Sequence, residues 1–304
     1  MEDWMVNNGW KGTIFLILII VVCAMGGCAY RDSLRTEIAK VVGNASGEVG
    51  VAIVGPGSFD TLLLHGNDHF PMQSVFKFPL AIAVLHRVDS GILSLDQRIH
   101  LKKEDLLSGT WSPLREKYPG GNVDIALREL LAFTVSQSDN NGCDMLFRLL
   151  GGTETVNRCI HDLGIADIAI VATEEEMHRG WEVQYRNWCT PFAMAQLLQR
   201  CFHDSILSRG SRDYLWLLMV ETSTGAGRIK GQLPSGTIVA HKSGSSGTND
   251  DGIAAATNDV GIVVLPNGRQ FIIVVFVSDS RANESARDET LARISRVAWD
   301  AFNR

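Results

Sequence analysis

The sequence predicts an α+β fold in which strands from both ends of the chain form one sheet around a helical middle section. Two features carry this prediction: β-branched residues flanked by turns near each end, and apolar residues at helical spacing between about 124 and 220. Pro266-Asn267-Gly268 is typical of a hairpin turn between the last two strands. Strands are expected at 47–54, 59–65, 237–242, 254–265 and 271–279.

Helices are predicted where apolar residues recur every three or four positions. They are expected at 33–42, 80–88, 125–134, 142–150, 153–163, 191–202, 211–220 and 283–302. Pro79 lacks an N–H and clashes with a preceding helical turn, so the helix that contains it is expected to begin close to Ser74. The segment 171–188 is polar and acidic and is interpreted as a long loop.

Composition limits the function classes. The chain has 304 residues, of which 45% are hydrophobic and 20% charged, as in ordinary globular proteins. This length allows one large domain or two closely packed lobes. A net charge of −6 without a long basic run argues against nucleic acid as a partner.

Residues 1–28 have the pattern of a targeting segment. Lys11 precedes an unbroken apolar run, Ile14 to Met25, which is shorter than the roughly 20 residues of a membrane span and fits a signal-peptide core. Export to the periplasm is therefore expected. Cleavage after a small residue would release a soluble protein, whereas cleavage before Cys28 would leave a lipid-anchored one. An uncleaved anchor is the third possibility.

Four of the six cysteines follow the targeting segment. Four cysteines allow three pairings, and their irregular spacing favours none of them over buried free thiols. There is no Cys-x-x-Cys pair, and neither a metal site nor a cofactor is expected. The four cysteines are Cys143, Cys159, Cys189 and Cys201.

Ser74 and Lys77 form the first candidate catalytic pair. Residues three apart share one face of a helix, and a desolvated neutral lysine can take the proton that makes a serine hydroxyl nucleophilic. A helix start also directs free N–H groups towards developing negative charge. Taken alone, the pair is more often a surface serine beside a lysine that reaches solvent.

Two further motifs strengthen the interpretation. Ser138-Asp139-Asn140 falls between two predicted helices, and His241-Lys242-Ser243-Gly244 falls on a predicted strand. Singly, the first is typical of a turn or helix cap and the second of a strand end. Together with Ser74-x-x-Lys77, and in this order, they match the S-x-x-K, S-D-N and K-T-G set of penicillin-interacting serine enzymes.

With these motifs the chain resembles a class A serine β-lactamase from about residue 32 to 304. The resemblance points to the branch found in Bacteroides-type bacteria, which contains several cephalosporin-hydrolysing enzymes. It implies a β-lactamase/D,D-peptidase-like fold, with an antiparallel five-stranded sheet flanked by terminal helices and an inserted all-helical lobe. The expected lobes are 30–66 with 221–304, and 67–220. Further stretches that carry the resemblance are 72–77, 173–177, 184–188 and 240–244.

The resemblance also implies roles in forming an acyl-enzyme. Ser74 attacks the lactam carbonyl and Lys77 exchanges its proton. Ser138 relays a proton to the lactam nitrogen, while Lys242 holds the Ser138 hydroxyl and the substrate carboxylate. Backbone N–H groups of Ser74 and Ser245 form the oxyanion hole.

Other residues are implied in substrate binding and in deacylation. Asn140 binds the side-chain amide of the substrate, and Ser243 and Gly244 line the substrate site. Glu174 in the loop activates the water that hydrolyses the ester, and the base for acylation is disputed between Glu174 and the lysine. The expected partner is a small β-lactam, and the protein is expected to be a monomer.

The sequence departs from the common family pattern at several positions. His178 stands where many members have an asparagine near the hydrolytic water, and Ala172 replaces the arginine whose salt bridge pins the loop. Ser243 replaces a threonine and keeps its hydroxyl. No arginine closely follows the third motif, so Arg228 is the candidate for the positive charge near the substrate carboxylate.

Three functions share the first motifs. A β-lactamase needs a deacylating base, for which Glu174 is the candidate. A D,D-peptidase would lack that base, and a membrane-bound β-lactam sensor would stay acylated and carry real membrane spans. The cysteine pair of some carbapenem-hydrolysing members is missing, since Gln73 and Ser246 occupy those positions, which argues against that activity.

Overall fold

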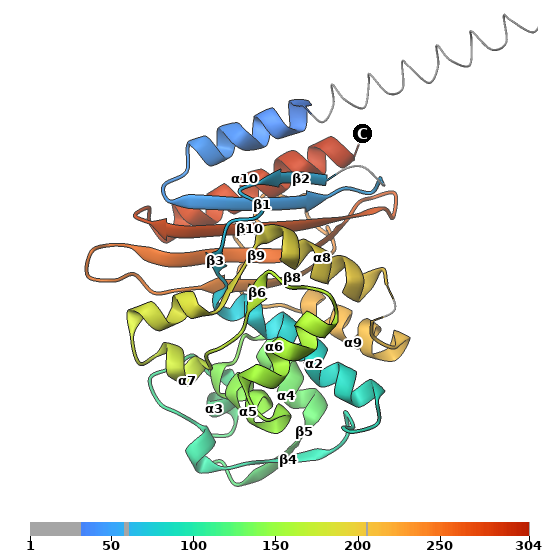
Figure 1. The fold of residues 1–304 in the computed structure, drawn as a ribbon, viewed down its shortest axis with the longest axis vertical. Coiled ribbons are helices and arrows are strands. Elements are labelled where there is room, and N and C mark those ends of the chain that lie inside the picture. Colours follow the sequence, from blue (N-terminus) through green and yellow to red (C-terminus); the bar gives the residue numbers. More distant parts are fainter. Residues whose placement is uncertain (1–31, 58–60, 205, 304) are drawn as a thin grey trace, which may run out of the picture.

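One antiparallel five-stranded sheet is the central element of the computed structural model, which describes residues 32–57, 61–204 and 206–303. Its strand order, β2-β1-β10-β9-β8, brings both ends of the chain into one sheet and confirms the predicted architecture (Figure 1). The targeting segment with Cys28, and the start of the second predicted strand, lie outside the described residues. The strands are β1 (Glu48–Val54), β2 (Thr61–Leu64), β8 (Val239–Ser245), β9 (Ala254–Val264) and β10 (Gln270–Ser280).

Both faces of this sheet are buried, which explains why β10 is continuously apolar from Phe271 to Val277. Side chains of a strand alternate between faces, so Val274 and Phe276 of β10 belong to one apolar core while Ile273 and Val275 belong to the other. The second core is closed by α10 (Glu284–Phe302) and by the helical segment 32–43. The fold therefore has helices on both sides of the sheet.

The first core joins the sheet to a mainly helical region beyond β8, and α8 lies across the sheet (Figure 1). The helix α2 is buried along most of its length in this region, as its apolar sequence predicts. The helices are α2 (Lys77–Asp89), α3 (Pro113–Lys117), α4 (Leu127–Ser136), α5 (Asn140–Leu150), α6 (Thr153–Asp162), α7 (Glu174–Met177), α8 (Pro191–Phe202) and α9 (Arg209–Val220). The lobe boundaries at 66 and 220 stay a prediction.

The helical region also contains short strands that the sequence did not indicate. A helix starting at Ile125 was wrong, because Val123–Ala126 form β5 and pair with Arg98–Leu101, β4. The alternating residues Val123 and Ile125 suit a strand once that partner is present. A second small sheet joins β3 (Phe70–Pro71), β7 (Trp188–Cys189) and β6 (Ile168–Ala169). The predicted all-helical lobe is thus mainly, not wholly, helical.

The segment 171–188 is also more ordered than a plain loop. It contains α7 and the 3-10 helix η3 (Trp181–Arg186). Two further 3-10 helices are η1 (Gln73–Phe76) and η2 (Lys103–Asp105).

No helix within the described residues is long and apolar enough to cross a membrane. The four cysteines from Cys143 to Cys201 are free thiols.

Candidate active site

The predicted nucleophile lies where the chain passes from one helix type to another. Ser74 is in η1 and Lys77 is the first residue of α2, so the helix begins close to Ser74 as expected. Pro79 is then the third residue of α2, in the first turn, where an N–H has no intrahelical acceptor. Gln73 has a φ of +48°, a strained conformation for a residue with a Cβ, next to the nucleophile.

Lys77 connects four of the predicted site residues. Its Nζ lies 2.8 Å from Ser74 Oγ and 2.6 Å from Asn140 Oδ1. The same atom lies 2.6 Å from Glu174 Oε1 and 3.1 Å from the Ser138 carbonyl oxygen. Three ammonium protons thus face four oxygens, and the Lys77 side chain has no exposed surface. This group is held in one place, beside the serine hydroxyl.

Ser138 lies in the turn between α4 and α5, as predicted. Asp139 caps α5 by accepting a hydrogen bond from the Gly142 N–H, which fixes the turn. Ser138 has a φ of +58°, and its hydroxyl accepts a hydrogen bond of 2.9 Å from Lys242 Nζ. The Asn140 amide donates to Thr110 Oγ1 at 2.7 Å, so both ends of the Asn140 side chain are engaged.

The third motif lies on β8, the strand nearest the helical region. Burial, and then the charge of Lys77, lower the pKa of the fully buried Lys242 well below its ordinary value. Gly244 is required by close packing, because a Cβ there would lie 2.6 Å from the Met72 carbonyl oxygen and 3.1 Å from the Ser74 nitrogen. The strand therefore passes directly against the backbone of the nucleophile.

Glu174 enters the site from the first turn of α7. A capping box between Thr173 and Glu176 starts this helix, and the Asp144 carboxylate accepts the N–H groups of Glu174 and Glu175 at 2.8 and 2.9 Å. Burial, and then the neighbouring Glu174, raise the pKa of Asp144 to about 6. Glu174 is buried, and its Oε1 lies 3.5 Å from Ser74 Oγ.

The loop that carries Glu174 lacks the arginine salt bridge of the common family pattern, because Ala172 stands at the position of that arginine. Hydrogen bonds from neutral side chains hold the loop instead. The fully buried Asn187 side chain accepts hydrogen bonds from the N–H groups of Val171 and Ala172, at 2.8 and 2.9 Å, and donates one to the Ala172 carbonyl at 2.7 Å. A second link, Gln184 to Gln73 at 2.5 Å, ties the loop to the residue before Ser74. Neutral amides thus fasten both ends of this segment.

Arg228 lies close to the third motif, but its donors are largely occupied. Its Nε pairs with Asp288 at 2.8 Å, and Nη1 donates to the carbonyls of Gly244 and Asn258 at 3.0 Å each. Nη2 donates to Ser245 Oγ at 2.7 Å. The Ser245 hydroxyl keeps its own proton, so it can donate to a carboxylate while Arg228 supplies the positive charge.

A cavity of about 330 Å³ is lined by five of the predicted site residues, Ser74, Asn140, Glu174, His178 and Ser245. It opens beside Ser74 and contains the exposed ring of His178, whose Nδ1 lies 3.2 Å from the Glu174 carbonyl oxygen. The other predicted site residues, Lys77, Ser138, Arg228, Lys242, Ser243 and Gly244, are not among its lining residues. The lining residues are Gln73, Ser74, Asn140, Glu174, Met177, His178, Gly180, Trp181, Gln184, Ser245, Ser246 and Gly247.

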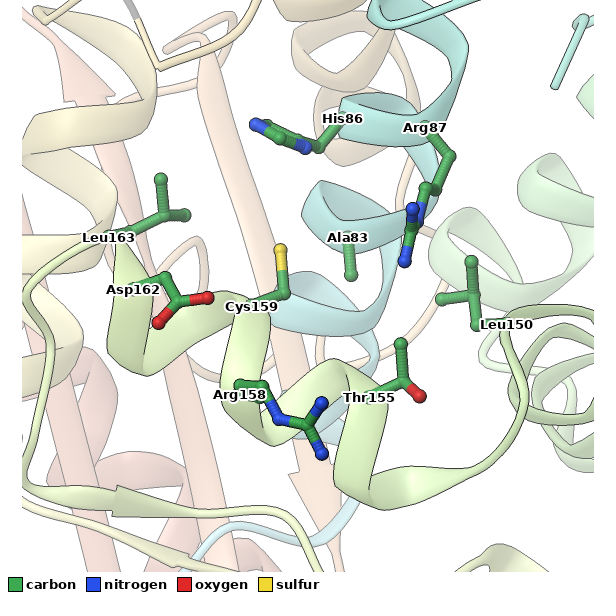
Figure 2. Close-up of a pocket in the computed structure, with 9 residues that line it drawn as sticks. All are labelled: Ala83, His86, Arg87, Leu150, Thr155, Arg158, Cys159, Asp162 and Leu163. Carbon is green, nitrogen blue, oxygen red and sulfur yellow. The ribbon is translucent and has the colours of Figure 1, made fainter. Parts of the chain in front are cut away.

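A second cavity, of about 320 Å³, lies between α2 and α6 and contains none of the predicted site residues (Figure 2). Arg87 and His86 reach it from the end of α2, and Cys159 and Arg158 from α6 (Figure 2). No group of three or more His, Cys, Asp or Glu residues in the described part of the chain is arranged to hold a metal ion.

Two supporting residues were missed at the sequence level. Asp144 holds the start of α7, and Asn187 holds the loop, yet each has an ordinary sequence neighbourhood. Both act by hydrogen bonds to backbone groups at least 15 residues away, which no local pattern reveals. Asn187 lies in the stretch 184–188, which carries the family resemblance but no pattern of its own.

The fold and this cluster define a serine hydrolase, in which a buried lysine and a carboxylate stand beside one hydroxyl nucleophile. The model of the β-lactamase enzyme family matches residues 33–302, nearly the whole chain. The chain belongs to this family: it is a class A serine β-lactamase, which hydrolyses the β-lactam ring and confers resistance to β-lactam antibiotics.

Relatives of known name support this assignment over nearly the whole length. The chain is 43% identical over 294 residues to β-lactamase VEB-1 of Pseudomonas aeruginosa, covering 96% of this chain and 98% of that protein. It is 40% identical over 291 residues to a β-lactamase of Bacteroides uniformis, covering 95% and 97%. The crystal structure of the TLA-1 extended-spectrum β-lactamase superposes with a TM-score of 0.88 at 51% identity, covering 90% and 99%. The peptidase and sensor alternatives find no support among these relatives.

Proposed function

We propose that this β-lactamase opens the ring of penicillins and cephalosporins through an ester on Ser74, which Glu174 then allows water to hydrolyse. The observation that carries the proposal is the buried cluster in which Lys77 Nζ lies 2.8 Å from Ser74 Oγ and 2.6 Å from Glu174 Oε1. Nucleophilic catalysis needs such a base within hydrogen-bond reach of the hydroxyl.

In the acylation step, the Ser74 oxygen attacks the lactam carbonyl carbon. Its proton passes either to Glu174 Oε1, 3.5 Å away, or to Lys77 Nζ, 2.8 Å away, once Lys77 has given one of its own protons to Glu174 Oε1 at 2.6 Å. The oxyanion is stabilised by the backbone N–H groups of Ser74 and Ser245, each of which contributes about 3–4 kcal/mol in comparable hydrolases. As the C–N bond breaks, Ser138 passes a proton to the lactam nitrogen, with its hydroxyl held by Lys242 at 2.9 Å.

In the deacylation step, water attacks the ester carbonyl while the Glu174 carboxylate takes its proton. Glu174 reaches the ester from α7 in the loop, whereas Ser138 comes from the turn between α4 and α5 and Lys242 from β8. The position of His178 beside the Glu174 carbonyl supports a role in ordering that water. As the bond from the carbonyl carbon to the Ser74 oxygen breaks, that oxygen takes back a proton from Glu174, directly or through Lys77, and the opened acid is released.

Substrate recognition is proposed to use the charge at the end of β8. Lys242 and Arg228 supply positive charge, and the hydroxyls of Ser243 and Ser245 supply hydrogen bonds for the β-lactam carboxylate. Asn140 binds the side-chain amide through the remaining N–H of its Nδ2. No metal ion takes part in this scheme.

Export is proposed to deliver the enzyme to the periplasm, where β-lactams reach their targets. The support is the short apolar run of residues 14–25, of signal-peptide length. The Gly26-Gly27-Cys28 sequence that follows supports a lipid anchor on Cys28. We propose that the mature protein works as a monomer.

Glu174→Gln tests the mechanism. Glutamine keeps the size of glutamate but cannot accept the proton, so the acyl-enzyme should accumulate on Ser74. General bases contribute about 10²–10⁴-fold, and deacylation should slow to that extent. Intact-mass spectrometry after mixing with a cephalosporin should show one stable adduct on the variant and little on the wild-type protein.

Three controls make the result specific. Ser74→Ala should abolish both hydrolysis and the adduct while leaving the protein folded. Glu175→Gln and Glu176→Gln should turn over normally, because these neighbours lie outside the lysine–serine cluster. A trapped adduct on either neighbour would reassign the base, and a wild-type protein that stays acylated for hours would overturn the proposal.

A further inference from the structure

A buried acid–base pair lies behind the active site, on the face of the sheet that α10 covers. His241 of β8 and Asp259 of β9 have no exposed surface, and His241 Nδ1 lies 2.8 and 3.0 Å from the two Asp259 carboxylate oxygens. A carboxylate only accepts hydrogen bonds, so the proton of this contact belongs to Nδ1. His241 Nε2 is also buried and has no hydrogen-bond partner in the described part of the chain.

Stability alone gives a weak account of this pair. Burying two ionisable groups costs desolvation that their attraction often fails to repay, and an unpartnered ring nitrogen adds to that cost. Apolar residues of similar volume would fill the same space at least as well. The pair is therefore better explained by what its hydrogen bonds hold in place.

The Asp259 carboxylate fastens the segment 222–229 at Ile229, and the main chain of His241 holds its other end. Asp259 Oδ2 accepts a hydrogen bond of 3.2 Å from the Ile229 N–H, and Thr222 Oγ1 donates one of 2.7 Å to the His241 carbonyl. Both ends of the segment are thus tied to the same two residues. The residue before Ile229 is Arg228.

The segment so fastened contacts the hydroxyls proposed to meet the substrate carboxylate. Thr224 Oγ1 lies 2.7 Å from Ser243 Oγ, and Arg228 Nη2 lies 2.7 Å from Ser245 Oγ. A Cβ on Gly225 would lie 2.8 Å from the Ser243 Cβ, so the backbone itself packs against the third motif. A small shift of this segment would move both hydroxyls.

We propose that Asp259, oriented by His241, is a positioning residue for substrate binding, which fixes the Ile229 backbone and thereby places Arg228 and Thr224 against Ser245 and Ser243. This inference rests on the carboxylate subsite of the proposed function. Asp259 contacts no substrate in this scheme and acts through the segment 222–229.

The charge of Asp259 has a second, measurable consequence. Burial and the charges of Lys77 and Arg228 lower the pKa of Lys242. The charges of Asp259 and Glu174 act in the opposite direction and raise it. Loss of the Asp259 charge should lower the pKa of Lys242 further. The alkaline limb of the activity profile should then move to lower pH.

A double-mutant cycle tests the proposal. Asp259→Ala should raise KM for a penicillin about tenfold with a smaller change in kcat. Asp259→Asn keeps an acceptor for the Ile229 N–H, so it should recover most of the KM while still showing the shifted alkaline limb. In an Arg228→Ala background, Asp259→Ala should add little to KM, because the two residues act through one subsite.

The outcomes separate the possible roles. Additive effects of Asp259→Ala and Arg228→Ala, or a loss in kcat alone, would mean that Asp259 serves only the fold, and the proposal would be overturned. If Asp259→Ala does not fold, His241→Gln takes its place in the same cycle, because it removes the ring that orients Asp259. Ser295→Ala is a control: it removes a buried α10 hydroxyl that has no hydrogen-bond partner among the described residues, and it should leave KM unchanged. A wild-type KM in Arg228→Ala itself would reject the carboxylate subsite independently of Asp259.

Discussion

Asn187→Ala should detach the Glu174 loop while leaving the rest of the fold intact. The substitution removes three hydrogen bonds of 2.7 to 2.9 Å between a fully buried side chain and the backbone of Val171 and Ala172. Each such bond contributes about 1 kcal/mol net, and buried groups left without partners cost more. Val171 is partly exposed, so water can replace one of the lost contacts.

The expected loss is therefore about 2–3 kcal/mol in the free energy of unfolding. For a domain of this size that corresponds to a Tm lowered by roughly 5–10 °C. Catalysis should suffer more, because a misplacement of about 1 Å in a catalytic group can cost 10²-fold. Deacylation should slow more than acylation, since Glu174 is in the loop and Ser74 is not.

Urea unfolding and single-turnover kinetics with a chromogenic cephalosporin measure these two effects. Asn157→Ala is a matched control, because Asn157 also accepts one backbone N–H, that of Ile170, at 2.9 Å, outside the loop. It should cost about 1 kcal/mol and leave deacylation unchanged. A Tm within 1 °C of wild type in Asn187→Ala, together with normal deacylation, would show that Asn187 does not hold the Glu174 loop in place.

Three further predictions follow from the site. Arg228→Ala should raise KM about tenfold with less effect on kcat, and Arg228→Lys should recover only part, since it keeps charge without the planar fork. His178→Asn should change deacylation more than acylation, whereas normal kinetics in both His178→Asn and His178→Ala would make the ring a bystander. The pKa of Asp144, raised by burial to about 6, means that the folded state binds a proton more tightly than the unfolded chain, where the value is 3.8. Stability should then fall as pH rises through that window, by up to about 3 kcal/mol relative to Asp144→Asn. Parallel stability curves for the two proteins between pH 4 and 7 would contradict this.

Much of the architecture follows from local pattern. The last two strands of the large sheet are found because both of its faces are buried, which makes β10 and the end of β9 apolar runs with a clear turn between them. The helix α8 begins and ends at its predicted residues, since Thr190 caps it and Pro191 occupies its first position.

The short strands could not be predicted in the same way. β5 has four residues and depends on its partner β4, which ends 22 positions before β5 begins. The sequence of β4, Arg-Ile-His-Leu, is a weak strand signal by itself. Of the site, the residues in motifs were found, but the side chains that hold them were not. Asn187 and Asp259 act on backbone N–H groups that are distant along the chain, and only the folded structure brings them together.

Because Cys143, Cys159, Cys189 and Cys201 are free thiols, the part of the chain that the structure describes can fold without forming a disulfide. Cys143, Cys189 and Cys201 are fully buried, and burial raises the pKa of each thiol, so none is poised to react. A reducing agent should leave this region unchanged, and the same fold should form in a reducing cytosol as in an oxidising compartment. Cys159 differs, because its sulfur reaches the cavity between α2 and α6. A thiol-specific label there would report on the far end of the helix that begins at Lys77 without entering the catalytic cavity.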